Sequence, residues 1–97
     1  MNYQIDPDRV DRIAAHLRDL IGIQTYLAYA GHSHTSMHVS KYWLKIDIYC
    51  HSLAELWAVQ CVAKKTIKED FKREIVRLST DNSEKFYCIT YSKYLEQ

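Results

Sequence analysis

The sequence predicts an α+β fold, a two-layer sandwich with helices on one face of a small sheet in the order αββαβ. A helix start signal at Asp6-Pro7 precedes apolar residues at helical spacing, and apolar and polar residues alternate within Val39–Cys50. A capping-box pattern that begins at Ser52 then predicts a second helix. If Asn2–Ile5 adds an edge strand, the order becomes βαββαβ, the ferredoxin-like arrangement. The alternative is an all-α bundle of three or four helices.

Length and composition predict a single small globular domain over residues 1–97. The chain is 47% hydrophobic and 26% charged, has a formal net charge of +1, and contains 2 Gly and 1 Pro. High apolar content with low net charge argues against disorder. No apolar run reaches the roughly 18 residues of a membrane helix, and the first residues lack the pattern of a signal peptide. We therefore expect a cytoplasmic protein with no membrane partner.

The cysteines also indicate a reducing compartment. Cys50, Cys61 and Cys88 are an odd number and form no Cys-x-x-Cys pair, unlike the even disulfide frameworks of small secreted chains. Each stands beside apolar or aromatic residues, so we expect all three to be small buried hydrophobic side chains. Nothing in the sequence calls for a cofactor.

The first helix is predicted over about Pro7–Ile21. Asp6 is a suitable N-cap residue, and proline is favoured at the first helical position. The apolar residues that follow recur at spacings of three and four and form one stripe: Val10, Ile13, Leu17, Leu20 and Ile21. Gly22 is the expected end of the helix. The next segment, residues 23–30, fits either a strand or a continued helix.

The middle of the chain allows two interpretations. Residues 31–36 have the composition of a polar turn, and the alternation within Val39–Cys50 is typical of a strand. The same segment also places Trp43 and Ile46 on one helical stripe. The capping box at residues 52–55 favours the strand, because it indicates that a helix begins there rather than continues.

The second half of the chain is predicted to be mostly helical. From Leu53 to about Leu78 there is no Gly or Pro, and residues 64–66 are the point at which this helix could break. Apolar residues at helical spacing mark one face: Ala63, Ile67, Phe71, Ile75 and Leu78. After a turn at residues 79–83, the segment 85–95 has strand propensity at its start and a helical alternative.

Tyrosine is the one residue type in excess, at 8 of 97 residues. Exposed tyrosines offer a large rigid contact area at a small entropic cost, which is why protein interfaces favour them. The candidate partner-binding residues are Tyr26, Tyr29, Tyr42, Tyr49, Tyr87, Tyr91 and Tyr94. We expect a small non-enzymatic protein-binding module, as inhibitors, antitoxins, immunity proteins and phage-encoded modulators are, which binds a partner protein or forms a homodimer.

A nucleic-acid-binding module is the alternative function. Basic residues concentrate on the predicted second helix: Lys64, Lys65, Lys68, Lys72, Arg73 and Arg77. Such a stripe can neutralise phosphates while tyrosines on the sheet stack against bases. Because Glu69, Asp70 and Glu74 are interleaved with it, a salt-bridged solvent face is the simpler interpretation.

The histidines give a second alternative, a His-rich metal-binding protein. His32, His34 and His38 lie in one short polar segment, and neutral imidazoles are good ligands for zinc or nickel. Their spacing matches no standard zinc pattern, and the segment contains no Asp or Glu. We therefore expect a solvated turn and no metal.

The sequence contains none of the common catalytic motifs. It has no Gly-x-Ser-x-Gly, no glycine-rich phosphate loop and no His-Glu-x-x-His. The spacing of Arg9 and His16 resembles the arginine-to-histidine element of HEPN ribonucleases, although Val10 stands where that element commonly has a polar residue. We expect both side chains to be solvated and the protein not to be an enzyme.

Overall fold

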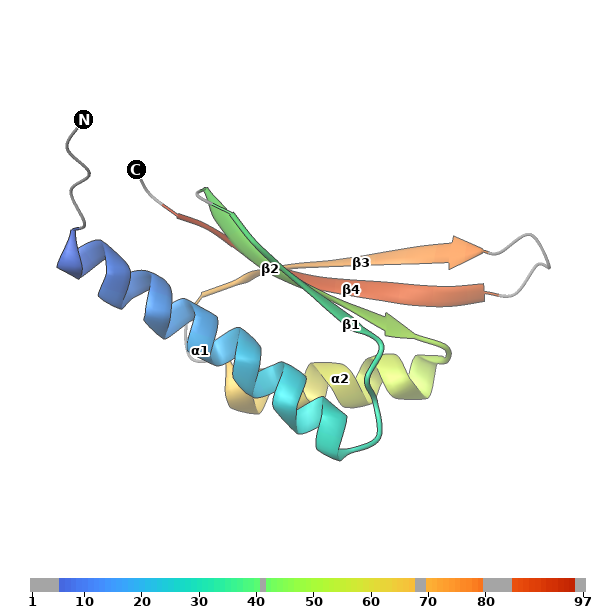
Figure 1. The fold of residues 1–97 in the computed structure, drawn as a ribbon. Helices are drawn as coiled ribbons and strands as arrows, with labels where there is room; N and C mark the ends of the chain where they lie inside the picture. Colours follow the sequence, from blue (N-terminus) through green and yellow to red (C-terminus); the bar gives the residue numbers. More distant parts are fainter. Residues whose placement is uncertain (1–5, 41, 68–69, 80–84, 96–97) are drawn as a thin grey trace.

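A computed structural model describes residues 6–40, 42–67, 70–79 and 85–95 of the chain. The structure contains two helices and a four-stranded sheet, which confirms the α+β prediction and does not favour the helical bundle (Figure 1). The elements are α1 Pro7–Tyr29, β1 Thr35–Val39, β2 Trp43–Cys50, α2 Leu53–Thr66, β3 Lys72–Ser79 and β4 Lys85–Tyr94. The order is therefore αββαββ, with one strand more than the sequence predicts. The edge strand expected at Asn2–Ile5 lies outside the described residues.

The sheet consists of two hairpins joined side by side. Its strand order is β1-β2-β4-β3, and every neighbouring pair is antiparallel. At the centre, Ile46 of β2 pairs with Met37 of β1 and with Tyr91 of β4. Both helices lie on the same side of this sheet, and its other face carries no helix (Figure 1).

The core lies between the helices and the two central strands. Alternate residues of β2 are fully buried, as the period-two pattern predicts: Leu44, Ile46, Ile48 and Cys50. The remaining buried residues come from both helices and from β4: Leu20, Ile23, Leu27, Leu56, Val59, Ala63, Ile89 and Tyr91. Within the described residues, neither helix combines the length and apolarity needed to cross a membrane.

Helix α1 begins as predicted but ends later. The Asp6 side chain accepts a hydrogen bond from the Asp8 backbone N–H at 3.0 Å, and proline follows the cap. The prediction that the helix ends at Ile21 is wrong, because the helix continues through Gly22 to Tyr29. The chain reverses at Gly31, whose φ of 86° lies in the left-handed region that glycine tolerates.

The reason for a glycine inside α1 is its closeness to α2. A Cβ atom built on Gly22 would lie 3.1 Å from Cγ2 of Thr66, which is tighter than ordinary van der Waals contact. The glycine therefore marks the close approach of the two helices and does not stop α1.

We predict that Gly22→Ala and Thr66→Ser are coupled in stability. Alanine is favoured over glycine in a helix by about 1 kcal/mol. In the Thr66→Ser background, which lacks Cγ2, this gain should be realised, whereas in the wild-type background part of it should be lost to crowding. Urea unfolding of the four proteins of this double-mutant cycle measures the coupling. Strict additivity would contradict the close contact.

Helix α2 begins where the capping box predicts. The Glu55 backbone N–H donates to the Ser52 hydroxyl at 3.1 Å, while the Glu55 carboxylate accepts from the His51 backbone N–H at 2.7 Å. The helix ends at Thr66, within the segment 64–66 at which the sequence allows a break. The prediction of helix up to Leu78 is wrong, because residues 72–79 form strand β3.

Of the three segments that the sequence left open, residues 23–29 continue helix α1 and the other two are extended. Strands β1 and β2 form a hairpin where Val39–Cys50 could have been a helix, and β1 itself begins inside the segment expected to be a turn. The C-terminal segment is strand β4, which pairs with both β2 and β3.

Strand β3 is the outer strand of the second hairpin and is poorly covered. Only Leu78 among its residues is partly buried, and Ile75 and Val76, which point to opposite faces, are 43% and 49% exposed. Figure 1 shows this hairpin extending past the N-terminal end of α2. The hairpin therefore adds sheet surface that the helices do not cover.

Candidate functional site

Helix α2 carries apolar residues on its exposed side as well as on its buried side. Leu53 is 65% exposed and Trp57 is 70% exposed, although both belong to a helix whose other face fills the core. The exposed apolar side continues through small residues, Ala54, Ala58 and Cys61. A helix that is apolar all round is normally buried on both sides. We call these five residues the α2 surface.

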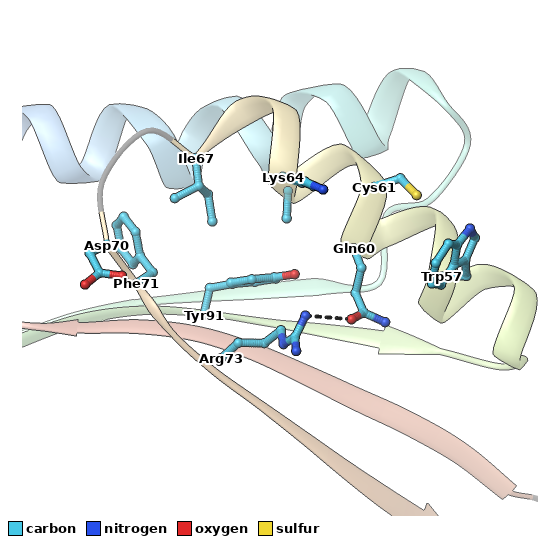
Figure 2. A pocket seen from close by; sticks show the side chains of 10 residues that line it. Trp57, Gln60, Cys61, Lys64, Ile67, Asp70, Phe71, Arg73 and Tyr91 are labelled. Carbon is cyan, nitrogen blue, oxygen red and sulfur yellow. Dashed lines mark hydrogen bonds between the residues drawn. The ribbon is translucent and has the colours of Figure 1, made fainter.

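A pocket adjoins the α2 surface, between α2 and the start of β3. Its volume is about 490 Å³, within the usual range of ligand pockets. Figure 2 shows Trp57 at one end, Phe71 and Asp70 at the other, and the Tyr91 ring across the middle. Lys64 and Ile67 lie on the α2 side and Arg73 on the β3 side. Rings and an aliphatic side chain therefore form the walls, and one cationic residue lines the pocket on each side.

Gln60 holds Arg73 in place. The Arg73 guanidinium donates to Oε1 of Gln60 at 2.8 Å, as the dashed line in Figure 2 marks. Nε2 of the same amide donates to the Leu56 carbonyl at 3.4 Å, which fixes the direction in which the amide points. Within the described part of the chain, no carboxylate lies within ion-pair distance of Arg73. The guanidinium is thus oriented at the pocket by a neutral partner and has further N–H donors to offer.

Tyr91 is the buried base of the pocket. It is 6% exposed, and burial raises the pKa of its hydroxyl, although the nearby Arg73 charge acts in the opposite direction. The hydroxyl is therefore neutral in the physiological range and supplies a hydrogen-bonding group, not a charge.

The seven tyrosines do not share one surface. Four are exposed, by 47% to 90%: Tyr26, Tyr29, Tyr42 and Tyr94. The other three, Tyr49, Tyr87 and Tyr91, are buried or half-buried. Tyr26 and Tyr29 belong to α1, whereas Tyr42 and Tyr94 lie at one end of the sheet, where the Leu95 N–H donates to the Tyr42 carbonyl at 2.7 Å. The exposed candidates therefore form two separate pairs.

The basic residues do not form a helical stripe. Lys64 and Lys65 lie in the last turn of α2, whereas Lys72, Arg73 and Arg77 belong to β3. Lys68 lies outside the described residues. Alternation along β3 places Lys72 on the sheet face without helices, where its Nζ lies 2.9 Å from the Glu74 carboxylate. The predicted basic helix face is therefore wrong, because the helix ends before most of it.

His38 lies apart from the other histidines. Its Nε2 lies 3.2 Å from the Asp47 carboxylate and 3.1 Å from the Ser36 hydroxyl, on the sheet face without helices. Thr90 donates a hydrogen bond to the same Asp47 carboxylate at 2.5 Å. These contacts join three strands across the sheet.

His34 lies beside His51, a contact that the sequence did not indicate. Nδ1 of His34 and Nε2 of His51 are 3.3 Å apart, and the ring of His32 lies 6.3 Å from that of His34. Among the residues that the structure describes, no group of three or more His, Cys, Asp or Glu side chains is arranged to hold a metal ion.

The thiols differ from the expectation that all three are buried. Cys50 is buried and Cys88 is half-buried, but Cys61 is exposed at the edge of the pocket. Cys61 has apolar neighbours in the sequence, as expected, but it lies on the side of α2 that no other described element covers.

The sheet face without helices has an aromatic and basic end. Trp43 and Tyr94 are cross-strand neighbours, and Nζ of Lys45 lies 5.0 Å from the centre of the Trp43 ring. A hollow of about 240 Å³ lies among these side chains and Lys72. Glu74 also lines it, so the charge of this hollow is mixed.

Comparison with known proteins gives no further information on function. Neither a protein-family model, nor a curated protein, nor a solved structure matches this chain.

Sequence reasoning missed the α2 surface and the pocket beside it. It assigned the tyrosines to binding and did not assign Trp57 or Leu53 to it. One signal was available: between Leu53 and Cys61 the helix contains a single charged residue, Glu55. A two-layer fold buries only one side of such a helix, so the other side must be exposed or bound.

Proposed function

We propose that this protein is a small non-enzymatic protein-binding module and that its partner binds the α2 surface. The observation that carries the proposal is the 70% exposure of Trp57 beside the exposed Leu53. Tryptophan is enriched among the residues that dominate binding energy, and a contiguous exposed apolar patch is typical of an interaction site. The core does not account for this exposed side, because α2 already buries its opposite side.

Three further features support this surface. Trp57 lies on a capped helix, so its backbone is held rigid before binding, which lowers the entropic cost of association. The pocket beside it offers a depression for a side chain of the partner. The small residues Ala54 and Ala58 let a partner backbone approach α2 closely.

We predict that Trp57→Asp weakens partner binding at least thirtyfold. The change removes a large apolar contact and places a charge where the partner must exclude water. A tagged pull-down from nuclease-treated lysate of the source cell or its host, analysed by mass spectrometry, identifies the partner. Titration of the recovered partner with the wild type and with the variant then measures the two dissociation constants. Because Trp57 is largely exposed, the variant should unfold at nearly the same urea concentration as the wild type.

Tyr29→Ser is the matched control, since Tyr29 is 90% exposed but lies at the end of α1. The proposal is supported if a protein is captured in stoichiometric amount after nuclease treatment by the wild type and by Tyr29→Ser, but not by Trp57→Asp. A partner that both variants retain would overturn the assignment to α2.

Nucleic-acid binding is the second candidate, and the pairing of Trp43 with Tyr94 favours it. Neighbouring aromatic rings on the open face of a sheet can stack bases, and Lys45 and Lys72 lie close enough to contact phosphates. In the same pull-down, this function would appear as material that nuclease removes and that Trp57→Asp leaves unchanged. The mixed charge of the hollow makes it the weaker candidate.

A further inference from the structure

We infer that the pocket between α2 and β3 receives an acidic side chain of the partner protein, flanked by an apolar residue, and that Arg73 binds its carboxylate. The inference rests on the proposed function, since it names the chemistry of the segment that binds beside the α2 surface. It depends on the charge of the pocket, the orientation of Arg73 and the character of the walls.

The charge of the pocket favours an anion. Two cationic side chains line it, Lys64 and Arg73, against one carboxylate, Asp70. Figure 2 shows Asp70 at the Phe71 end of the pocket and the Arg73 guanidinium at the Gln60 end. The region between Trp57 and Tyr91 is therefore the basic end.

The orientation of Arg73 favours a carboxylate as that anion. Its contact with Gln60 uses one terminal nitrogen, Nη1, and with respect to the residues that the structure describes, other N–H donors of the planar guanidinium remain for a ligand. A guanidinium binds a carboxylate through two parallel hydrogen bonds, and such charge-assisted bonds are stronger than neutral ones. Because a neutral amide already orients the group, little side-chain entropy remains to be lost on binding.

The walls favour an apolar group next to the carboxylate. Ile67, Phe71 and the Tyr91 ring line the cavity, and Trp57 closes its outer end. A small inorganic anion would leave these walls uncovered. An acidic residue adjacent to a Leu or Phe in an extended or helical segment would satisfy both parts of the pocket, while the rest of the segment covers the α2 surface.

The test uses three probes and a protein with one tryptophan. In the Trp43→Phe background, Trp57 is the sole tryptophan and reports occupancy through its fluorescence and indole N–H resonance. The probes are the capped dipeptides acetyl-Phe-Glu-amide and acetyl-Phe-Gln-amide, and 4-phenylbutyrate as a free small carboxylate. We expect the Glu dipeptide to bind about five- to tenfold more tightly than the Gln dipeptide at low salt.

Arg73→Gln should reduce this preference to less than twofold, while Arg77→Gln should leave it intact. Arg77 is the matched control because it lies four residues further along β3 on the same side and does not line the pocket. Equal binding of the two dipeptides, or a preference that survives Arg73→Gln, would overturn the inference. Binding of 4-phenylbutyrate without binding of the Glu dipeptide would also overturn it and would assign the pocket to a small-molecule carboxylate.

The two proposals fail in different ways. If the inference alone is wrong, the probes show no carboxylate preference while Trp57→Asp still abolishes partner binding. If the proposed function is wrong, Trp57→Asp binds the partner as tightly as the wild type does, whatever the dipeptides show.

Discussion

Ile46→Ala is expected to lower the free energy of unfolding by about 2–5 kcal/mol. Ile46 is fully buried in the middle of β2, with β1 and β4 paired on either side and the helices above it. Alanine there loses the transfer free energy of the missing carbons, and the surrounding sheet cannot collapse into the space they leave. A domain of this size has a total stability of about 5–15 kcal/mol, so the loss is a large fraction of it.

Ile75→Ala is the matched control for this prediction. The residue type and the substitution are the same, but Ile75 lies on the outer strand and is 43% exposed. Its cost should be below about 1 kcal/mol. Urea denaturation followed by circular dichroism measures both variants. Similar losses at the two positions would contradict a core centred on β2.

A shift to alkaline pH is expected to destabilise the protein through Cys50. Burial, with smaller contributions from Glu55 and Cys88, raises the pKa of the Cys50 thiol from 9.0 to about 11. In the unfolded chain the thiol releases its proton near its ordinary pKa, whereas in the folded protein it holds the proton longer. The contribution to stability is therefore complete below pH 9 and is lost as the pH rises toward the folded value, by about 2–3 kcal/mol in all.

The measurement is the free energy of unfolding at several pH values between about 8 and 11, in the wild type and in Cys50→Ala. The variant is less stable at neutral pH, because it leaves a cavity, but its stability should fall less steeply over this range. Groups that do not interact with Cys50 titrate equally in both proteins, so the difference in slope reports Cys50 together with its small coupling to Tyr91 and Cys88. Parallel curves would show that the thiol ionises without a penalty.

The start of each helix and the inward face of β2 could be predicted from local sequence. Asp6-Pro7 and Ser52 act through hydrogen bonds within a few residues of themselves, so their effect does not depend on the rest of the fold. The alternation in β2 reflects burial on one side, and the structure buries the predicted residues. The α+β class follows from these elements together.

The end of α1 and the identity of β3 could not be predicted in this way. Gly22 has the composition of a helix end, but here it lies where α2 comes close, which only packing reveals. The segment 72–79 carries apolar residues compatible with a helical stripe. It is extended because its whole length, from Lys72 to Ser79, pairs with residues 85–92 of β4.

For the candidate site, too, some features could be predicted from the sequence and others could not. The sequence alone determined that the chain has two capped helices, an alternating central strand and more aromatic side chains than its core can hold. Only the tertiary structure decided which of them are exposed: it buried Tyr91, exposed Trp57 and placed Arg73 against Gln60. Exposure depends on which surfaces the other layer covers, and that is a property of long-range packing, which no local pattern contains.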